Sequence, residues 1–228
     1  AAATVRRIVS RTGRYKLPLI AGFSVATVAI FSLSFLDPNS PYWQEAISMF
    51  FAGAGLGAAM PILNLAVQNE FEQKDLGAAT ASTQLFRGLG STVGTAVLGT
   101  LLVSGVTAGL GNLHQDTYIK SLESNPAASQ LLGDLNSDTA LSLNTAAVKE
   151  RIMSEVSQAT HDLPDPIRGQ ATQQFMADQT RFGDRVVAAF SDSLRAVFYL
   201  SSALMLAATI ISLAVVEKPL RGGHDDTP

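Results

Sequence analysis

Long apolar blocks alternate with polar connections along the chain, and this pattern predicts its elements. Four blocks reach the length of about 20 mostly apolar residues that a membrane-spanning helix needs. They cover residues 17–36, 46–67, 77–106 and 196–216. The first and fourth blocks contain no charged residue. We therefore expect an all-α, polytopic integral membrane helical bundle with four transmembrane helices.

Glycines distinguish the second and third blocks from the other two. Water does not compete for helix backbone bonds inside a bilayer, so glycine is tolerated there and lets two helices approach closely. Two pairs have the spacing of small residues that favours such packing, namely Gly53 with Gly57 and Gly90 with Gly94. We expect these four glycines to serve helix packing.

The same two blocks supply the candidate substrate-cavity residues. A charge inside a membrane helix is costly and marks a functional candidate. Arg87 is either a cavity or gate residue, which contacts the substrate or pairs with an acidic residue outside this chain, or it extends to the membrane surface. Asn64, Gln68 and Gln84 either bind a substrate or hold helices together. Pro61 removes a backbone hydrogen bond and should kink the second block. The kink is either a hinge or a feature accommodated by packing.

Basic residues predict the topology, because cytoplasmic loops carry an excess of Lys and Arg. The basic residues are densest before the first block, whereas the link between the first two blocks has none. This predicts a cytoplasmic loop over 1–16, three transmembrane helices within 17–106, an extracytoplasmic loop over 107–195, the last transmembrane helix at 196–216 and a cytoplasmic tail over 217–228. Both ends would face the cytoplasm from the inner (plasma) membrane.

The predicted external loop carries two apolar stripes at helical spacing. The first consists of Val148, Ile152, Val156, Ala159 and Leu163, and the second of Ile167, Ala171, Phe175, Phe182, Val186 and Phe190. Prolines lie between the two stripes. We expect a helical hairpin whose second helix continues into the fourth block. The alternative is a mobile loop with fraying helices.

Composition argues against several classes of protein. The chain has no cysteine, which excludes disulfides and thiolate metal sites. Its net charge of -3 argues against nucleic-acid binding, which needs a basic face. The histidines at 114, 161 and 224 are not clustered, so we expect no metal site. No nucleophile–base set is suggested, so we expect no catalytic residue and no enzyme.

Several motifs together carry a family resemblance. The chain reads GAGLGAAMP from Gly53, GAATAS from Gly77 and RGLGSTVG from Arg87. With the long loop before the last block, these motifs resemble the C-terminal part of a drug:proton antiporter. The family is the fourteen-helix branch of the major facilitator superfamily, the multidrug efflux permeases.

A basic run before the first block extends the resemblance. Arg11, Gly13, Arg14 and Lys16 are similar to the basic cytoplasmic loop that recurs in each half of this superfamily. That motif has an acidic residue just before its first Arg, and this chain has Ser10 there. The resemblance therefore does not extend to carboxylate-based gating at the loop.

The resemblance implies part of a proton-coupled transporter that exports small amphipathic or cationic compounds by alternating access. It implies the proton gradient as the energy source and no cofactor. The implied partners are a small-molecule substrate, the lipid bilayer and an N-terminal part of the transporter upstream of Ala1. The second and third blocks would line the cavity. The alternative, from another class, is a four-helix membrane protein whose external hairpin senses a ligand or docks a partner.

Overall fold

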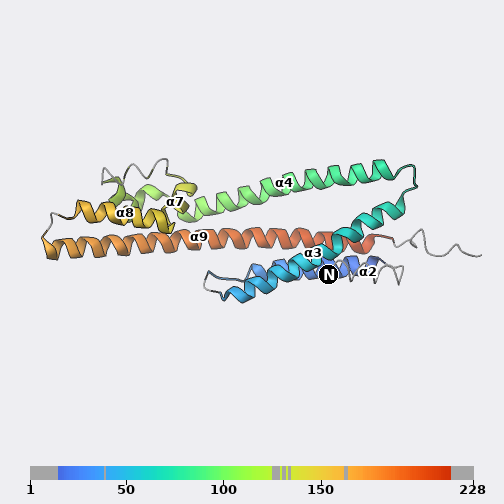
Figure 1. Cartoon of the computed structure of the whole chain (residues 1–228), viewed down its shortest axis with the longest axis horizontal. Coiled ribbons are helices and arrows are strands. Elements are labelled where there is room, and N and C mark those ends of the chain that lie inside the picture. The colour runs from blue at the N-terminus through green and yellow to red at the C-terminus, as the bar shows by residue number, and fades with distance from the viewer. Residues whose placement is uncertain are drawn as a thin grey trace, which may run out of the picture. The chain divides into compact units, whose positions relative to one another are not determined.

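The computed structural model describes most of the chain (Figure 1). The described residues are 15–38, 40–124, 129, 132, 135–161 and 164–216. They divide into two compact units, and the regular elements found in them are all helices. Unit 1 comprises the described residues within 1–98 and 195–228, and unit 2 comprises those within 99–194. The loop residues Arg11, Gly13 and Arg14 lie outside the described residues, as does the tail over 217–228.

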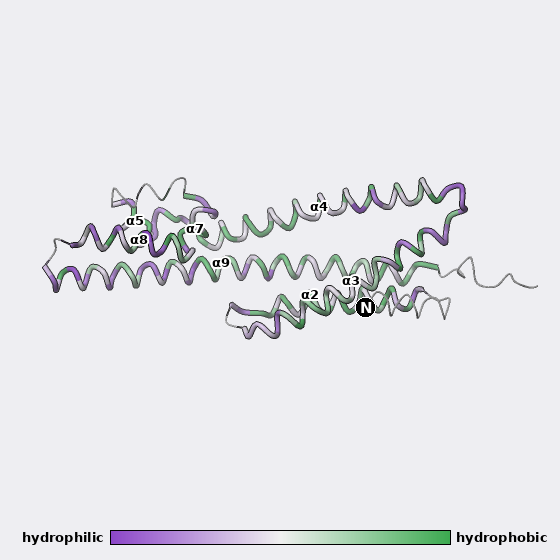
Figure 2. The backbone as a smooth tube through the Cα atoms, in the orientation of Figure 1, coloured by the Kyte–Doolittle hydropathy of each residue, from purple (hydrophilic) through white to green (hydrophobic). Residues whose placement is uncertain are grey.

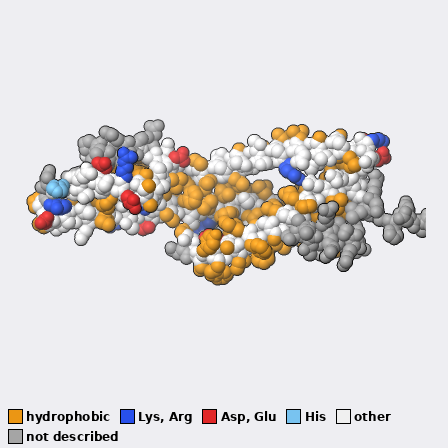
Figure 3. Space-filling view, viewed as in Figure 1, with side chains coloured by type: hydrophobic (Ala, Val, Ile, Leu, Met, Phe, Trp, Pro, Cys, Tyr) orange, Lys and Arg blue, Asp and Glu red, His pale blue; other side chains and the backbone are white. Residues whose placement is uncertain are grey.

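Four helices in the described residues are long and apolar enough to cross a membrane. They are α2 (Lys16–Leu33), α3 (Tyr42–Glu70), α4 (Leu76–Leu110) and α9 (Asp165–Ala214). Many of their large hydrophobic side chains are exposed, such as Phe50, Phe86 and Ile211. Figures 2 and 3 show apolar residues gathered on α2, α3 and the end of α9. Soluble proteins avoid such extended apolar surface. The prediction of an all-α polytopic membrane bundle with four spanning helices is confirmed.

Small residues let α2 and α3 pack closely in unit 1. A Cβ built at Gly55 would lie 2.5 Å from the carbonyl oxygen of Gly22 and 2.8 Å from the amide nitrogen of Ala26. Ala59 is fully buried beside this contact, and Ser32 donates a hydrogen bond of 2.8 Å to Ser48 across the two helices. The backbones approach closely because no side chain separates them.

The C-terminal part of α9 contacts α2. The Thr27 and Thr209 hydroxyls lie 3.3 Å apart, and the rings of Phe31 and Tyr199 lie 6.0 Å apart. Arg195 forms an ion pair with Asp37, which follows α2. The described residues of α2, α3 and the end of α9 therefore form one cluster that holds α3 in position.

Gly53, Gly57, Gly90 and Gly94, the glycines predicted to pack helices, make no close approach within the described chain. No described atom lies within 4 Å of a Cβ built at any of the four. At about 100° per residue, Gly53 and Gly57 project from α3 on the side opposite Gly55. Their packing role stays a prediction, and it concerns a face that the described residues leave uncovered.

Unit 2 has a hydrophobic core of its own. The core joins the end of α4, α5 (Thr117–Glu123), α7 (Ser137–Leu143), α8 (Ala146–Ala159) and the beginning of α9. The short helix η1 (Leu113–Gln115) precedes α5. Ile152 and Phe182, one from each predicted apolar stripe, are almost completely buried in the core. The second stripe and the fourth apolar block lie on one helix, α9.

Tyr118 occupies the centre of the unit 2 core. It is fully buried, its ring lies 5.2 Å from that of Phe182, and its hydroxyl accepts a hydrogen bond of 3.1 Å from Gln179. Burial raises the pKa of Tyr118, and the hydrogen bond from Gln179 opposes that rise. The helices α5 and α9 are thus joined by both apolar and polar contacts.

We expect Gly55→Ala to destabilise the full-length protein, because the added methyl group would meet the backbone of α2. Overpacking of this kind costs about 1–3 kcal/mol. The matched control is Gly77→Ala, since a Cβ there meets no described atom within 4 Å. Thermal unfolding in detergent should show a lower midpoint for Gly55→Ala than for Gly77→Ala. Equal midpoints would contradict the packing role of Gly55.

Asp116 offers a second test, because one side chain serves two contacts in unit 2. One carboxylate oxygen accepts a hydrogen bond of 2.8 Å from the backbone N–H of Tyr118, and the other forms an ion pair with Arg185. Losing a helix cap costs about 0.5–2 kcal/mol, and an ion pair with a half-exposed Arg adds less than about 1 kcal/mol. Asp116→Ala should therefore speed hydrogen exchange of α5 more than Asp116→Asn, which keeps the capping oxygen. The same exchange rate in both variants would show that the cap contributes nothing.

Candidate functional site

The helices α3 and α4 bring the candidate polar residues together in unit 1. A pocket of about 140 Å³ is lined by Asn64, Val67 and Gln68 of α3 and by Thr80, Thr83 and Gln84 of α4. Residues three and four positions apart project from the same side of a helix. This spacing, together with the short turn that connects the two helices, makes the side chains converge.

Arg87 lies on the same side of α4, one turn beyond Gln84. Its Nη2 atom donates a hydrogen bond of 2.9 Å to Oδ1 of Asn64. Among the described residues, Arg87 forms no ion pair with a carboxylate. The structure therefore gives Arg87 a polar partner in α3 and leaves its charge uncompensated within this part of the chain.

The remaining polar groups of the pocket are open to a ligand. The side-chain amides of Gln68 and Gln84 form no hydrogen bond with another described residue. Each amide offers two donors and an acceptor. The Thr83 hydroxyl donates to the Ala79 carbonyl at 2.8 Å, so its oxygen remains an acceptor. The pocket can thus hydrogen-bond a polar group of a small molecule.

Three residues of this pocket were not among the sequence candidates. They are Val67, Thr80 and Thr83. The spacing could have identified the two threonines, because positions 80, 83, 84 and 87 follow the i, i+3, i+4, i+7 pattern of one helix face. Threonine is common in apolar helices, where its hydroxyl bonds the preceding turn, and so it did not stand out by residue type.

The remaining predicted site residues lie away from the pocket. Pro61 lies inside α3, which runs as one helix from Tyr42 to Glu70. The hinge role of Pro61 stays a prediction. Lys16 is the first residue of α2. No group of three potential metal ligands occurs among the described residues. The Nδ1 atom of His114 lies 3.0 Å from Oε1 of Glu123.

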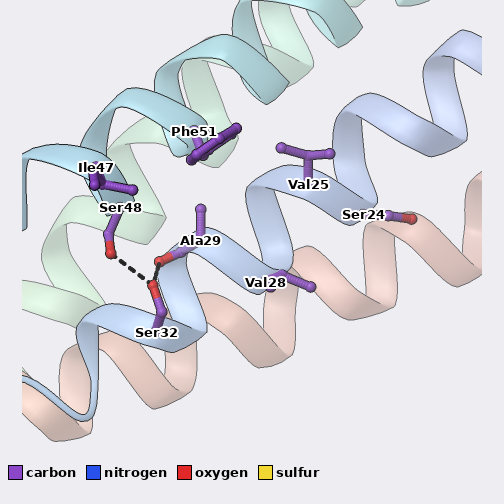
Figure 4. A pocket seen from close by; sticks show the side chains of 8 residues that line it. All are labelled: Ser24, Val25, Val28, Ala29, Ser32, Ile47, Ser48 and Phe51. Carbon is purple, nitrogen blue, oxygen red and sulfur yellow. Dashed lines mark hydrogen bonds between the residues drawn. The ribbon is translucent and has the colours of Figure 1, made fainter. Parts of the chain in front are cut away.

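A second and larger cavity lies between α2 and α3 (Figure 4). It measures about 410 Å³, and Val25, Val28, Ile47 and Phe51 make most of its lining apolar. The two serines nearest each other are hydrogen-bonded together across the helices (Figure 4). A third serine, Ser24, also lines this cavity, so its polar side chains are hydroxyl groups and it has none of the amides that line the pocket between α3 and α4.

The structure thus defines an integral membrane bundle with a polar pocket between two spanning helices. An uncharacterized MFS-type transporter of Mycobacterium tuberculosis is 29% identical over 219 residues, which cover 96% of this chain and 25% of that protein. The multidrug transporter protein MdtP of Bacillus subtilis is 34% identical over 128 residues, covering 54% of this chain and 23% of its own length. A tetracycline resistance determinant of Streptomyces rimosus is 22% identical over 121 residues, covering 53% and 35% respectively. No family model and no solved structure matches the chain.

These relatives confirm the resemblance to transporters of the major facilitator superfamily. The chain is homologous to part of an MFS-type transporter. Its relatives are transporters and not enzymes. The chain spans 25% of the length of the mycobacterial relative.

A double-mutant cycle tests the Arg87–Asn64 hydrogen bond. Each single change to Ala removes the bond, so the second change should cost less in the background of the first. Residues in one hydrogen-bond pair show interaction energies of about 0.5–3 kcal/mol. We expect a value near the lower end of this range, because hydrogen bonds between membrane helices contribute about 0.6 kcal/mol on average in such cycles. The measurement is the unfolding free energy of the full-length protein in detergent, and strict additivity would mean that the bond contributes nothing.

Proposed function

We propose that this chain is part of a proton-coupled secondary transporter that exports small amphipathic or cationic compounds by alternating access. The observation that carries the proposal is the pocket in which Asn64, Gln68 and Gln84 converge beside Arg87. Polar and ionisable groups inside membrane helices mark substrate pathways, since they are too costly to be kept without a role. Two of the relatives are named for multidrug transport and tetracycline resistance, which supports export as the direction.

Alternating access requires a rigid body that rocks against another around a central site. The close contact of Gly22 with Gly55 and the contacts of α9 with α2 provide a rigid cluster on one side of α3. The pocket residues lie on another side of α3, where it faces α4. In the proposed mechanism, the cluster moves as a unit and the pocket is exposed first to one side of the membrane and then to the other.

Proton coupling is assigned to the rest of the protein. The four apolar blocks contain no Asp or Glu, and a membrane proton relay is built from carboxylates or histidines. This chain would supply part of the substrate site, while the groups that bind and release protons would lie in the remaining portion of the transporter.

Arg87→Ala in the full-length protein should reduce export of its substrates at least tenfold while protein abundance stays unchanged. The reason is that the change removes the charge beside the pocket and leaves Asn64 without its partner. Lys74→Ala is the matched control, because Lys74 is exposed and its partner in the described part of the chain is the neighbouring Glu72. The measurement is dye and drug accumulation in cells that lack their own efflux pumps. Unchanged export by Arg87→Ala would remove the pocket from the proposed mechanism.

An uncoupler separates proton-driven export from the alternative classes. It should raise accumulation in cells that carry the gene to the level seen in cells without it. Equal accumulation with and without the gene, over a broad panel of compounds, would contradict export. A membrane protein that senses a ligand through its external helices would give that result.

A further inference from the structure

Among the described residues, the charged group bonded to the lining of the pocket between α3 and α4 is positive. All six residues that line it are uncharged, and the guanidinium of Arg87 is bonded to one of them. The acidic residues of the connecting turn, Glu72 and Asp75, line no part of the pocket, and Glu72 pairs with Lys74 at 2.9 Å. Within the described residues, the ionic group linked directly to the pocket is therefore a cation.

Arg87 and Asn64 together present several N–H donors at one end of the pocket. Oδ1 of Asn64 accepts a hydrogen bond from Arg87, and the amide nitrogen of Asn64 adds two N–H donors beside the guanidinium. The guanidinium has five N–H groups, and its bond to Asn64 is the interaction that the described residues give it. A guanidinium beside an amide N–H matches the paired oxygens of a carboxylate or a similar acceptor.

A permanent cation would be disfavoured in the same place. Two like charges within a few ångströms repel strongly where water is scarce, because the effective dielectric constant is low. No carboxylate among the pocket residues offsets that repulsion. An acceptor group, in contrast, gains both a charge-assisted hydrogen bond and an attraction.

We propose that the pocket selects amphipathic compounds with an acidic or acceptor-rich polar group, which Arg87 and Asn64 hold, and that it disfavours permanent cations. This inference rests on the proposed function and narrows its substrate class from amphipathic or cationic compounds to amphipathic acids and strong acceptors. The apolar part of the compound would lie against the hydrophobic surfaces of α3 and α4, and Gln68 and Gln84 would bond its further polar groups.

Two dyes with the same xanthene skeleton test the selectivity. Fluorescein carries a carboxylate and rhodamine 123 is a permanent cation. The full-length protein in proteoliposomes with an imposed proton gradient should transport fluorescein at least ten times faster than rhodamine 123. Equal rates, or faster transport of rhodamine 123, would overturn the inference and leave the proposed function intact. No proton-driven transport of either dye or of a wider panel would overturn both.

Asn64→Asp provides the sharpest variant, because it replaces an amide by a carboxylate of the same shape. The new carboxylate would pair with Arg87 and neutralise its charge in place. Fluorescein transport should fall about tenfold, while rhodamine 123 transport stays the same or rises. Gln73→Glu is the matched control, since it makes the same chemical change at an exposed residue of the turn that lines no part of the pocket.

Arg87→Gln tests the same selectivity independently, in case Asn64→Asp fails to fold. It removes the charge but retains a donor, and it should likewise lower the fluorescein-to-rhodamine ratio about tenfold. A cooperative unfolding transition of each variant, measured beside that of the unaltered protein, shows that the variant is folded. An equal loss of transport for both dyes in either folded variant would show a structural role for the pair and would overturn the inference.

Discussion

The close approach of α2 and α3 at Gly22 and Gly55 is the contact on which the site depends. At about 100° per residue, Gly55, Ala59 and Ile62 lie on one side of α3, while Asn64 and Gln68 lie on the opposite side. The first side is buried against α2. Because α3 is held there, its polar side must face away from the cluster. A bulkier residue at 55 would therefore both separate two helices and rotate or shift the polar face that carries Asn64.

The same geometry explains why the sequence identified the polar residues but not the helix contacts. Asn64 and Arg87 stand out by residue type in apolar surroundings, so they could be selected from the sequence. A glycine cannot be assigned in this way, because the sequence does not distinguish a glycine that packs against a helix from one that faces a cavity. Gly53 and Gly57 share the side of α3 that carries Asn64, whereas Gly55, two residues from each, makes the contact. Spacing alone could not show which face of α3 makes the helix contact, because that depends on where the partner helix α2 lies.

Length explains what the sequence pattern missed in unit 2. The stripes of α8 and of the beginning of α9 extend over several turns, so their apolar periodicity was visible. The helices α5 and α7 have 7 residues each, which is too short for such a pattern to emerge. Their presence depends on the shared core, where Tyr118 and Leu143 are almost completely buried. Tertiary burial and not local periodicity stabilises helices of this length.

The Arg87–Asn64 pair suggests that substrate binding and proton binding occur at different sites of the proposed transporter. A guanidinium remains protonated under physiological conditions, so Arg87 can attract an acceptor but cannot carry the coupled proton. Asn64 cannot do so either, because an amide does not titrate. A pocket built from such groups keeps its own charge unchanged on both sides of the membrane. Proton binding must then act at a distance, by changing which conformation is favoured, since nothing lining this pocket gains or loses a proton when the compound binds or leaves.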